Sequence, residues 1–444
     1  MQKIFSLVLA IGISSGLLAQ ETVLPAKEQK GSFYLIHATI HVGNGKVIRN
    51  GTIKVTNGKI EAVGDNITVP ANAENVTDLN GQDLYPGLIL PTSALGLVEI
   101  SAVRATQDVR EIGDMNPSVR SIVAYNTDSK VINTLRSNGI LLANVVPQGN
   151  FVAGTSSVVQ LDAWNWEDAA YKTDAGLHVY MPSLMPRPSF GGRGGGGFGR
   201  GEGGQSDPVK EGLDKMEELK AFFREAKAYQ QATDRKATNL KFEAVKGLFN
   251  RSQKLYMHAS TAKQILVALD FVKEFGFDMV IVGGSESYQV AELLKQHNVA
   301  VILGQPHSLP TGTDDDVDQP YKTAAELQRA GVLFSISDDD SQTRGRNLPF
   351  NAGTAAAYGL DREQALAAIT LNAARIMGVA DKTGSIEVGK DANIVVSSGD
   401  LLDMKSSNVT AAFIQGRKID LTDKHKLLNE RYEQKYDLKT RKGF

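Results

Sequence analysis

The chain has 444 residues, a length that predicts a large domain together with a smaller one rather than a single small core. Its charged fraction of 22% and its net charge of −2 give no electrostatic reason to expect binding to nucleic acid or to an anionic membrane. The absence of cysteine excludes disulfides, thiolate metal ligands and a cysteine nucleophile.

The first 20 residues have the pattern of a secretory signal peptide. Lys3 supplies a positive start, residues 4–18 are mostly apolar, and Leu17-Leu18-Ala19-Gln20 supplies a cleavage region. A short membrane anchor is the alternative, but the apolar run is shorter than the roughly 20 residues that a span needs. No later segment of the sequence is long and apolar enough to span a membrane. We therefore expect an exported protein, periplasmic or secreted.

Residues 33–65 predict a β-meander. Short alternating runs are separated by Gly43-Asn44-Gly45, Asn50-Gly51 and Asn57-Gly58, which all favour tight hairpins. Near the other end of the chain, GSIEVGKDANIVVSSGD and VTAAFIQGRKIDL predict further short strands of the same kind. Both ends of the chain are therefore expected to be rich in β-structure.

A glycine-rich segment interrupts the middle of the chain. Residues 191–204 read GGRGGGGFGRGEGG and include ten glycines, a composition that does not form a packed core. Its two arginines and one phenylalanine are also typical of RNA-binding segments. Export, the small net charge and the brevity of the segment disfavour RNA binding. We expect a flexible surface loop within an insert at 188–208.

The second half of the chain alternates strands and helices. Strand-like runs at 255–259, 279–284, 300–306 and 332–338 each precede a helical pattern, after an intervening loop in the last two. Four β-then-α units in succession predict a (β/α)₈ barrel, and a doubly wound open sheet is the alternative. The acidic run TGTDDDVD (311–318) lacks the fuller ligand pattern of a calcium loop, so we expect a solvated loop there.

Two motifs together resemble the amidohydrolase superfamily, in its imidazolonepropionase-like branch. The first is NGKIEAVG (57–64) followed by Pro-Gly-Leu-Ile (86–89), and the second runs from Ala368 to Val396 and ends in GSIEVGKDANIVV. The resemblance implies a TIM barrel and a small β-sandwich assembled from both chain ends. The implied order is a signal peptide (1–20), the N-terminal segment of the sandwich (31–85), the barrel (86–384), the C-terminal segment of the sandwich (385–424) and a helical tail (425–444).

The resemblance also implies a metal site at the barrel rim. Active family members carry His-x-His after strand 1, a Lys or Glu on strand 4 in many cases, one His after each of strands 5 and 6, and an Asp after strand 8. These ligands hold one or two divalent metals that activate water for attack on an amide-like C–N bond. In this sequence Thr92 and Ala94 occupy the two His positions, LHVYMP (177–182) offers no Lys or Glu, and Gly283-Gly284 ends strand 6.

His258 and Asp338 are what remains of that ligand set. They are the predicted metal ligands, with Asp338 also the predicted catalytic base and Asp339 and Asp340 as alternatives in the same run. His307, after strand 7, is the candidate third ligand. A catalytic zinc site has three protein ligands and a water, so the expected cofactor is one divalent metal, zinc, or none. Structural roles are the alternatives: a rim histidine, a helix-capping carboxylate and a loop histidine.

Four other residues are candidates for contact with a substrate. Glu99 and Arg104 follow the strand 1 exit within a charged stretch, and Arg346 and Asn347 follow strand 8, where an arginine can clamp a carboxylate. A solvated loop with ion pairs is the alternative. The remaining histidines have no acidic or His partner at ligand spacing in the sequence and are expected to be structural or exposed: His37, His41, His178, His297 and His425.

Two functions follow from these features. The first is a hydrolase of non-peptide C–N bonds, such as cyclic or linear amides, with a reduced or rearranged metal site. The second is a catalytically inactive protein of the same fold that binds a small molecule or a partner chain at the barrel mouth. The fold alone does not decide between them. No nucleic-acid partner is expected, and a homo-oligomer is compatible with either function.

Overall fold

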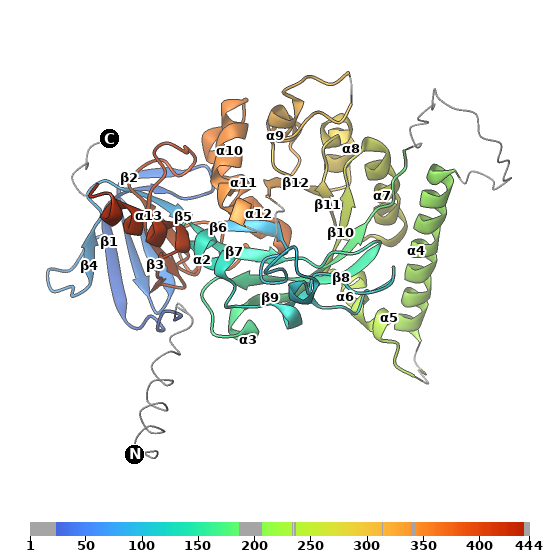
Figure 1. The fold of residues 1–444 in the computed structure, drawn as a ribbon, viewed down its shortest axis with the longest axis horizontal. Coiled ribbons are helices and arrows are strands. Elements are labelled where there is room, and N and C mark those ends of the chain that lie inside the picture. Colours follow the sequence, from blue (N-terminus) through green and yellow to red (C-terminus); the bar gives the residue numbers. More distant parts are fainter. Residues whose placement is uncertain are drawn as a thin grey trace, which may run out of the picture.

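The computed structural model describes residues 24–185, 207–232, 234, 237–312, 314–338 and 343–438. The predicted signal peptide, residues 188–206 of the predicted insert, and the alternative acids Asp339 and Asp340 lie outside these ranges. The described residues form two sheets of eight strands each, which lie side by side in Figure 1. None of the helices within these ranges combines the length and apolarity that crossing a bilayer requires.

The first sheet takes its strands from both ends of the chain. Its order is β16-β15-β14-β5-β1-β2-β3, and β4 pairs with β1. The strands are β1 (Ser32–His41), β2 (Val47–Thr56), β3 (Lys59–Gly64), β4 (Val76–Asp78), β5 (Asp83–Pro86), β14 (Ile394–Ser397), β15 (Val409–Ile414) and β16 (Arg417–Lys418). The prediction that both chain ends build one β-rich domain is confirmed, in the form of one mixed sheet.

The hairpin between β2 and β3 shows how local sequence sets this sheet. Thr56 pairs with Lys59, which leaves Asn57 and Gly58 as a two-residue turn, and both have positive φ (48° and 81°). Two positive φ values define the type I′ turn, whose twist matches that of the flanking strands. The hairpin fixes the register that buries Ile53, Val55 and Ile60 in the core of this domain.

The second sheet is a nearly closed barrel, as predicted. Its strands follow in chain order: β6 (Leu88–Ser93), β7 (Ile140–Val145), β8 (Val152–Gln160), β9 (Ala170–Tyr180), β10 (Lys254–Ala259), β11 (Met279–Gly283), β12 (Ala300–Leu303) and β13 (Phe334–Ile336). The last four coincide with the strands expected from the β-then-α units. β6 and β13 are the two ends of the order. A hydroxyl pair joins them, since Thr92 Oγ1 on β6 lies 2.7 Å from Oγ of Ser337, the residue that follows β13.

One strand departs from the expected all-parallel barrel. β8 is antiparallel to both β7 and β9, whereas the other neighbouring strands in this order are parallel. The connection from β7 to β8 spans only residues 146–151. A parallel neighbour needs a crossover of roughly a dozen residues or more, so the short connection forces a hairpin.

Helices cover the outside of the barrel (Figure 1). They are α2 (Lys130–Arg136), α3 (Trp166–Ala169), α4 (Pro208–Gln231), α5 (Leu240–Ala244), α6 (Lys246–Phe249), α7 (Ala262–Phe275), α8 (Ala291–Gln296), α9 (Gln319–Ala330), α10 (Leu348–Ala357), α11 (Arg362–Ala368) and α12 (Leu371–Met377), with α13 (Lys424–Lys435) near the C-terminus. α7 starts with a capping box between Thr261 and Gln264 and ends at Gly276 in the left-handed conformation. These caps set where the helix begins and ends.

Alternation along the strands separates the outer core from the barrel interior. On β10, Leu255 and Met257 belong to the large core that includes α7, whereas Tyr256 belongs to a small cluster with Val280 and Ile302. Successive side chains point to opposite faces of a strand. His258 therefore lies on the same inward face as Tyr256, at the carboxyl end of its strand.

Candidate functional site at the carboxyl end of the barrel

The exit of the first barrel strand is closed by packing. Thr92 and Ala94 are each 3% exposed, at the two positions where the resemblance implies histidines. The Thr92 hydroxyl is paired with that of Ser337, and Ser337 Oγ also lies 3.3 Å from the Thr92 carbonyl oxygen, to which it donates. Alanine has no donor atom for a metal, and the Thr92 hydroxyl is engaged in the seam of the barrel. This exit therefore contributes to closure of the barrel.

His258 is paired with a second histidine. Its Nε2 lies 3.0 Å from Nδ1 of His178 on β9, and Nε2 of His178 lies 2.8 Å from Oγ of Ser156 on β8. The Tyr180 ring stacks on His258 with centroids 3.8 Å apart. Three neighbouring strands thus supply one hydrogen-bonded chain across the barrel interior: Ser156, His178 and His258. His178 has no His partner at ligand spacing in the sequence, but strand pairing gives it one 80 residues away.

Burial keeps both imidazoles neutral. It lowers the pKa of His258 to about 3, and it lowers the pKa of His178 well below its usual value, with repulsion from a charged His258 as a further cause. A neutral imidazole has one N–H and one lone pair, so one ring donates to the other. The shared bond engages Nε2 of His258, and a metal at that atom would have to displace His178.

Asp338 is held by two partners. It is 1% exposed, Arg344 Nε donates to Oδ1 at 2.9 Å, and Asn351 Nδ2 donates to Oδ2 at 3.3 Å. Arg344 lies in the 3₁₀ helix η4 (Thr343–Asn347) and Asn351 in α10. Both carboxylate oxygens are engaged, and an arginine balances the charge. In this arrangement Asp338 anchors η4 and α10 to the end of β13.

The proposed third ligand lies elsewhere. His307 is exposed in the loop between β12 and α9, its Nε2 lies 3.2 Å from Thr354 Oγ1 on α10, and its ring meets Tyr321 edge-on. Over the parts of the chain that the structure describes, no group of three or more His, Asp or Glu side chains is arranged to hold a metal ion. The metal-binding side chains in the described part of the chain therefore do not fit the metal site that the resemblance implies.

Two of the four candidate substrate-binding residues, Glu99 and Arg346, make structural contacts. Glu99 accepts hydrogen bonds from Asn126 Nδ2 and Ser129 Oγ, at 3.0 and 3.1 Å, which pins the loop after β6 to the start of α2. Arg346 Nη1 lies 3.2 Å from His425 Nε2 on α13. Arg104 is exposed in a short 3₁₀ helix (Arg104–Thr106), and Asn347 immediately precedes α10.

Sequence reasoning missed several residues that build this site. Ser156, His178, Arg344 and Asn351 lie on four different elements. A weak signal exists for two of them: Arg344 and Asn351 belong to the stretch after strand 8 that was predicted to carry binding residues. Ser156 and His178 had no such marker, because their role depends on which inward-facing residues meet across β8, β9 and β10.

Comparisons with known proteins agree with the fold. Residues 150–419, more than half of the chain, match the model of the amidohydrolase family. An imidazolonepropionase of Picrophilus torridus is 31% identical over 198 residues, which cover 42% of this chain and 47% of that protein. An imidazolonepropionase of Thermoplasma volcanium is 38% identical over 82 residues, 18% of this chain and 20% of that protein. The matched segments thus span less than half the length of these curated relatives.

A solved structure extends the likeness over most of the chain. The crystal structure of an amidohydrolase from Thermotoga maritima MSB8 superimposes with a TM-score of 0.74 at 28% sequence identity. The match covers 87% of this chain and 99% of that one, so it includes both the barrel and the β-rich domain. The barrel with its sheet from both chain ends, together with the family match over residues 150–419, shows that the chain belongs to the amidohydrolase family.

Proposed function

We propose that this protein binds a small molecule at the mouth of its barrel and does not carry out metal-dependent hydrolysis there. The family implies hydrolysis of C–N bonds, typically with a bound metal. The single observation that supports a different use is that the remaining rim groups are engaged by the protein itself. His258 Nε2 is bonded to His178, and both oxygens of Asp338 are bonded to Arg344 and Asn351.

The chemistry of these groups supports the proposal. A catalytic zinc needs three protein ligands, and the described rim offers no such group. A general base works best with a pKa near the working pH, whereas the pKa of His258 is about 3. Asp338 is a carboxylate, but it is buried and paired with an arginine, so it is poorly placed to accept a proton from water.

The barrel wall offers polar atoms that a ligand could satisfy. Oδ1 of Asn144 on β7 and Oγ of Ser335 on β13 are buried and have no hydrogen-bond partner among the described residues. These strands flank β6 on its two sides, given the contact between Thr92 and Ser337. An unsatisfied buried polar group costs about 1–3 kcal/mol, so a small polar molecule or water that bonds to these atoms gains affinity from them.

A hydrolase with a rearranged site is the second candidate. One observation favours it besides family membership: the facing nitrogens of His178 and His258 are 3.0 Å apart, so that two imidazoles already lie close together at the rim. Two nitrogens fall one short of the three ligands of a catalytic zinc site.

Elemental analysis of the purified full chain, combined with activity assays, distinguishes the two candidates. We expect less than one metal per chain after exposure to zinc, and no hydrolysis of N-acyl amino acids or cyclic amides that depends on His258. His258→Ala and His178→Ala are the test variants, and His37→Ala, which removes an exposed histidine paired with Asp78, is the matched control. Stoichiometric zinc that is lost in both test variants together with hydrolysis would establish the hydrolase instead.

We also propose that the protein is exported, on the basis of its N-terminal sequence alone. The test is N-terminal sequencing of protein recovered from the periplasm or the medium. A start near residue 20 supports export, and an intact Met1 in the cytosolic fraction contradicts it.

A further inference from the structure

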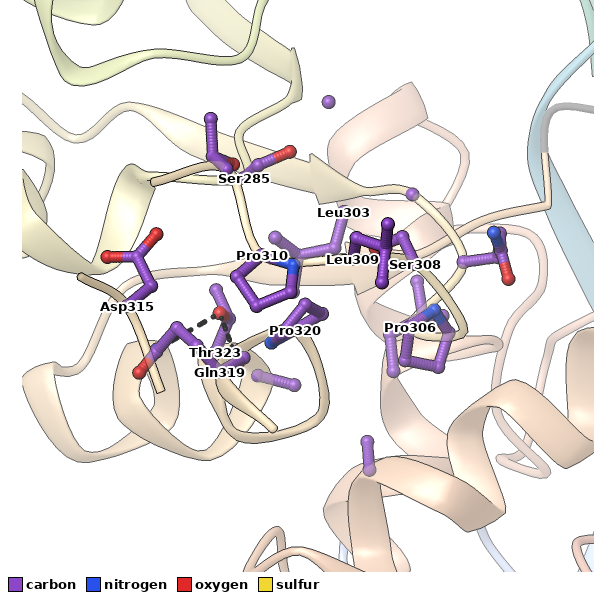
Figure 2. Close-up of a pocket in the computed structure, with 17 residues that line it drawn as sticks. Ser285, Leu303, Pro306, Ser308, Leu309, Pro310, Asp315, Gln319, Pro320 and Thr323 are labelled. Atoms are coloured by element: carbon purple, nitrogen blue, oxygen red, sulfur yellow. Dashed lines mark hydrogen bonds between the residues drawn. The ribbon is translucent and has the colours of Figure 1, made fainter. Parts of the chain in front are cut away.

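A cavity separate from the barrel interior lies beside the mouth, beneath the loop between β12 and α9 (Figure 2). It has a volume of about 60 Å³. Leu303, Ile336 and Ala324 line it and belong to the core outside the barrel wall. His258 and Asp338 do not line it. The cavity therefore adjoins the rim at Gly283, the end of the sixth barrel strand, β11, and does not include the two rim groups His258 and Asp338.

The walls of the cavity combine stiff apolar surface with polar side chains, among them Gln305, Ser308 and Gln319. Pro306, Pro310 and Pro320 contribute rings, and Figure 2 shows Pro310 and Pro320 in the middle of the lining with Asp315 on one side and Pro306 on the other. Proline rings fix the backbone torsion φ, so these walls lose little conformational freedom when a ligand binds. A ligand for this cavity needs a compact apolar body.

Asp315 is the one charged side chain among the described lining residues. Oδ1 accepts a hydrogen bond from Tyr288 Oη at 3.0 Å, and Oδ2 accepts one from the Gly312 backbone N–H at 2.8 Å. The nearby Lys322 is paired with Asp316 and Asp318 instead, at 3.2 and 2.7 Å. Within the described part of the chain Asp315 has no salt-bridge partner. Two hydrogen bonds thus fix a carboxylate at the edge of a partly apolar cavity, and no cationic side chain among the described lining residues balances its charge.

We propose that this cavity binds a small organic cation with a compact apolar body, of the class of short branched primary amines. The ammonium group lies against Asp315, and the apolar body packs on Leu303, Ile336 and the proline rings. The volume is less than half of the roughly 150 Å³ of a cavity that encloses benzene, so the enclosed part of the ligand is limited to a few atoms. An anionic ligand is disfavoured because no cationic side chain is among the described lining residues.

Three ligands of the same shape test the charge. Binding of 3-methylbutylammonium, 3-methylbutanol and 3-methylbutanoate to the full chain is measured by isothermal titration calorimetry and ligand-observed NMR at low salt. We expect the ammonium ion to bind roughly tenfold or more tightly than the alcohol, because only the ammonium ion adds the attraction of opposite charges to its hydrogen bond with the carboxylate. The carboxylate should bind most weakly. Equal binding of the ammonium ion and the carboxylate, or no saturable binding of the ammonium ion, overturns the proposal.

Variants locate the site. Asp315→Asn keeps the shape of the side chain and removes its charge. The asparagine oxygen can still accept from Gly312 N–H, and its amide can donate to Tyr288 Oη. This variant should lose the preference for the ammonium ion over the alcohol. Asp314→Asn removes the same charge from an exposed neighbour outside the lining and should leave the preference intact. Gly304→Val adds bulk at a lining position where a Cβ meets no atom within 4 Å, and it should weaken all three ligands. An unchanged preference in Asp315→Asn contradicts the proposal.

Discussion

Replacement of Arg344 by methionine tests whether Asp338 is a structural anchor. The change removes the cation that balances a carboxylate of 1% exposure, while Asn351 remains as its weaker partner at 3.3 Å. Loss of one partner of a fully buried pair costs about 3–5 kcal/mol. The Arg344 side chain is 52% exposed, so solvent screens part of the interaction, and we expect a loss of about 2–3 kcal/mol.

The double variant Asp338→Asn/Arg344→Met sharpens the test. It leaves no unpaired buried charge, so it should be more stable than Arg344→Met alone, although less stable than the native chain. Urea unfolding followed by the fluorescence of Trp164 and Trp166, which lie in the barrel connection between β8 and β9, measures the free energy of unfolding. Asp316→Asn, at an exposed acid of the loop between β12 and α9, serves as the control for charge removal.

Two results would refute this reasoning. An Asp338→Asn variant more stable than the native chain would mean that the carboxylate is held at a cost to stability, as is common for catalytic groups. An Arg344→Met variant within about 0.5 kcal/mol of the native chain would mean that the pair does not anchor η4.

Three further predictions follow from the same structure. The pKa of His258 is lowered to about 3, so the folded state binds fewer protons than the unfolded state between about pH 6.5 and pH 3. The contribution of His258 to the free energy of unfolding should therefore be full above about pH 6.5 and fall by about 1.4 kcal/mol per pH unit below about pH 6. Urea unfolding measured at a series of pH values should show a shallower fall for His258→Gln than for the native chain. Asp162→Asn disrupts a buried ion pair, in which the side chains of Arg136 and Asp162 are 4% and 1% exposed. We expect the free energy of unfolding to fall by about 3–5 kcal/mol, and a change below about 1 kcal/mol contradicts this expectation. Dialysis against EDTA should leave the thermal midpoint unchanged, whereas a drop that zinc restores would reveal a bound metal.

Much of the architecture could be predicted from particular segments. The runs at 255–259 and 279–284 are apolar and are each followed by an amphipathic helix, so their strands and parallel order were predictable. The turn at Asn57-Gly58 fixed a hairpin by local conformation alone. The reversal of β8 was not predicted, because VAGTSSVVQ (152–160) carries a β pattern that does not encode direction. Its direction follows from the shortness of the connection at 146–151.

The contacts of the candidate site depended on information that spacing does not carry. His258 could be placed at a strand exit, but its partner His178 is 80 residues away and meets it only because Tyr256 and His178 pair in register across β10 and β9. Asp338 could be placed at the last strand exit, but the reach of Arg344 back from η4 is a property of the loop conformation. The residue types predicted that the site lies at the strand exits, whereas strand register and loop conformation determine the hydrogen-bond partners of its side chains.

The contact between Thr92 and Ser337 has a consequence for biosynthesis. These residues are 245 positions apart: Thr92 lies in the first strand of the barrel, and Ser337 directly follows the last. While the chain emerges from the ribosome, the free edge of β6 has no partner until nearly all of the barrel has been made. Such an edge can pair with other chains, and contacts of long sequence separation form slowly. We therefore expect nascent chains that stop before residue 337 to depend on chaperones, and the barrel to gain protease resistance only once β13 is available.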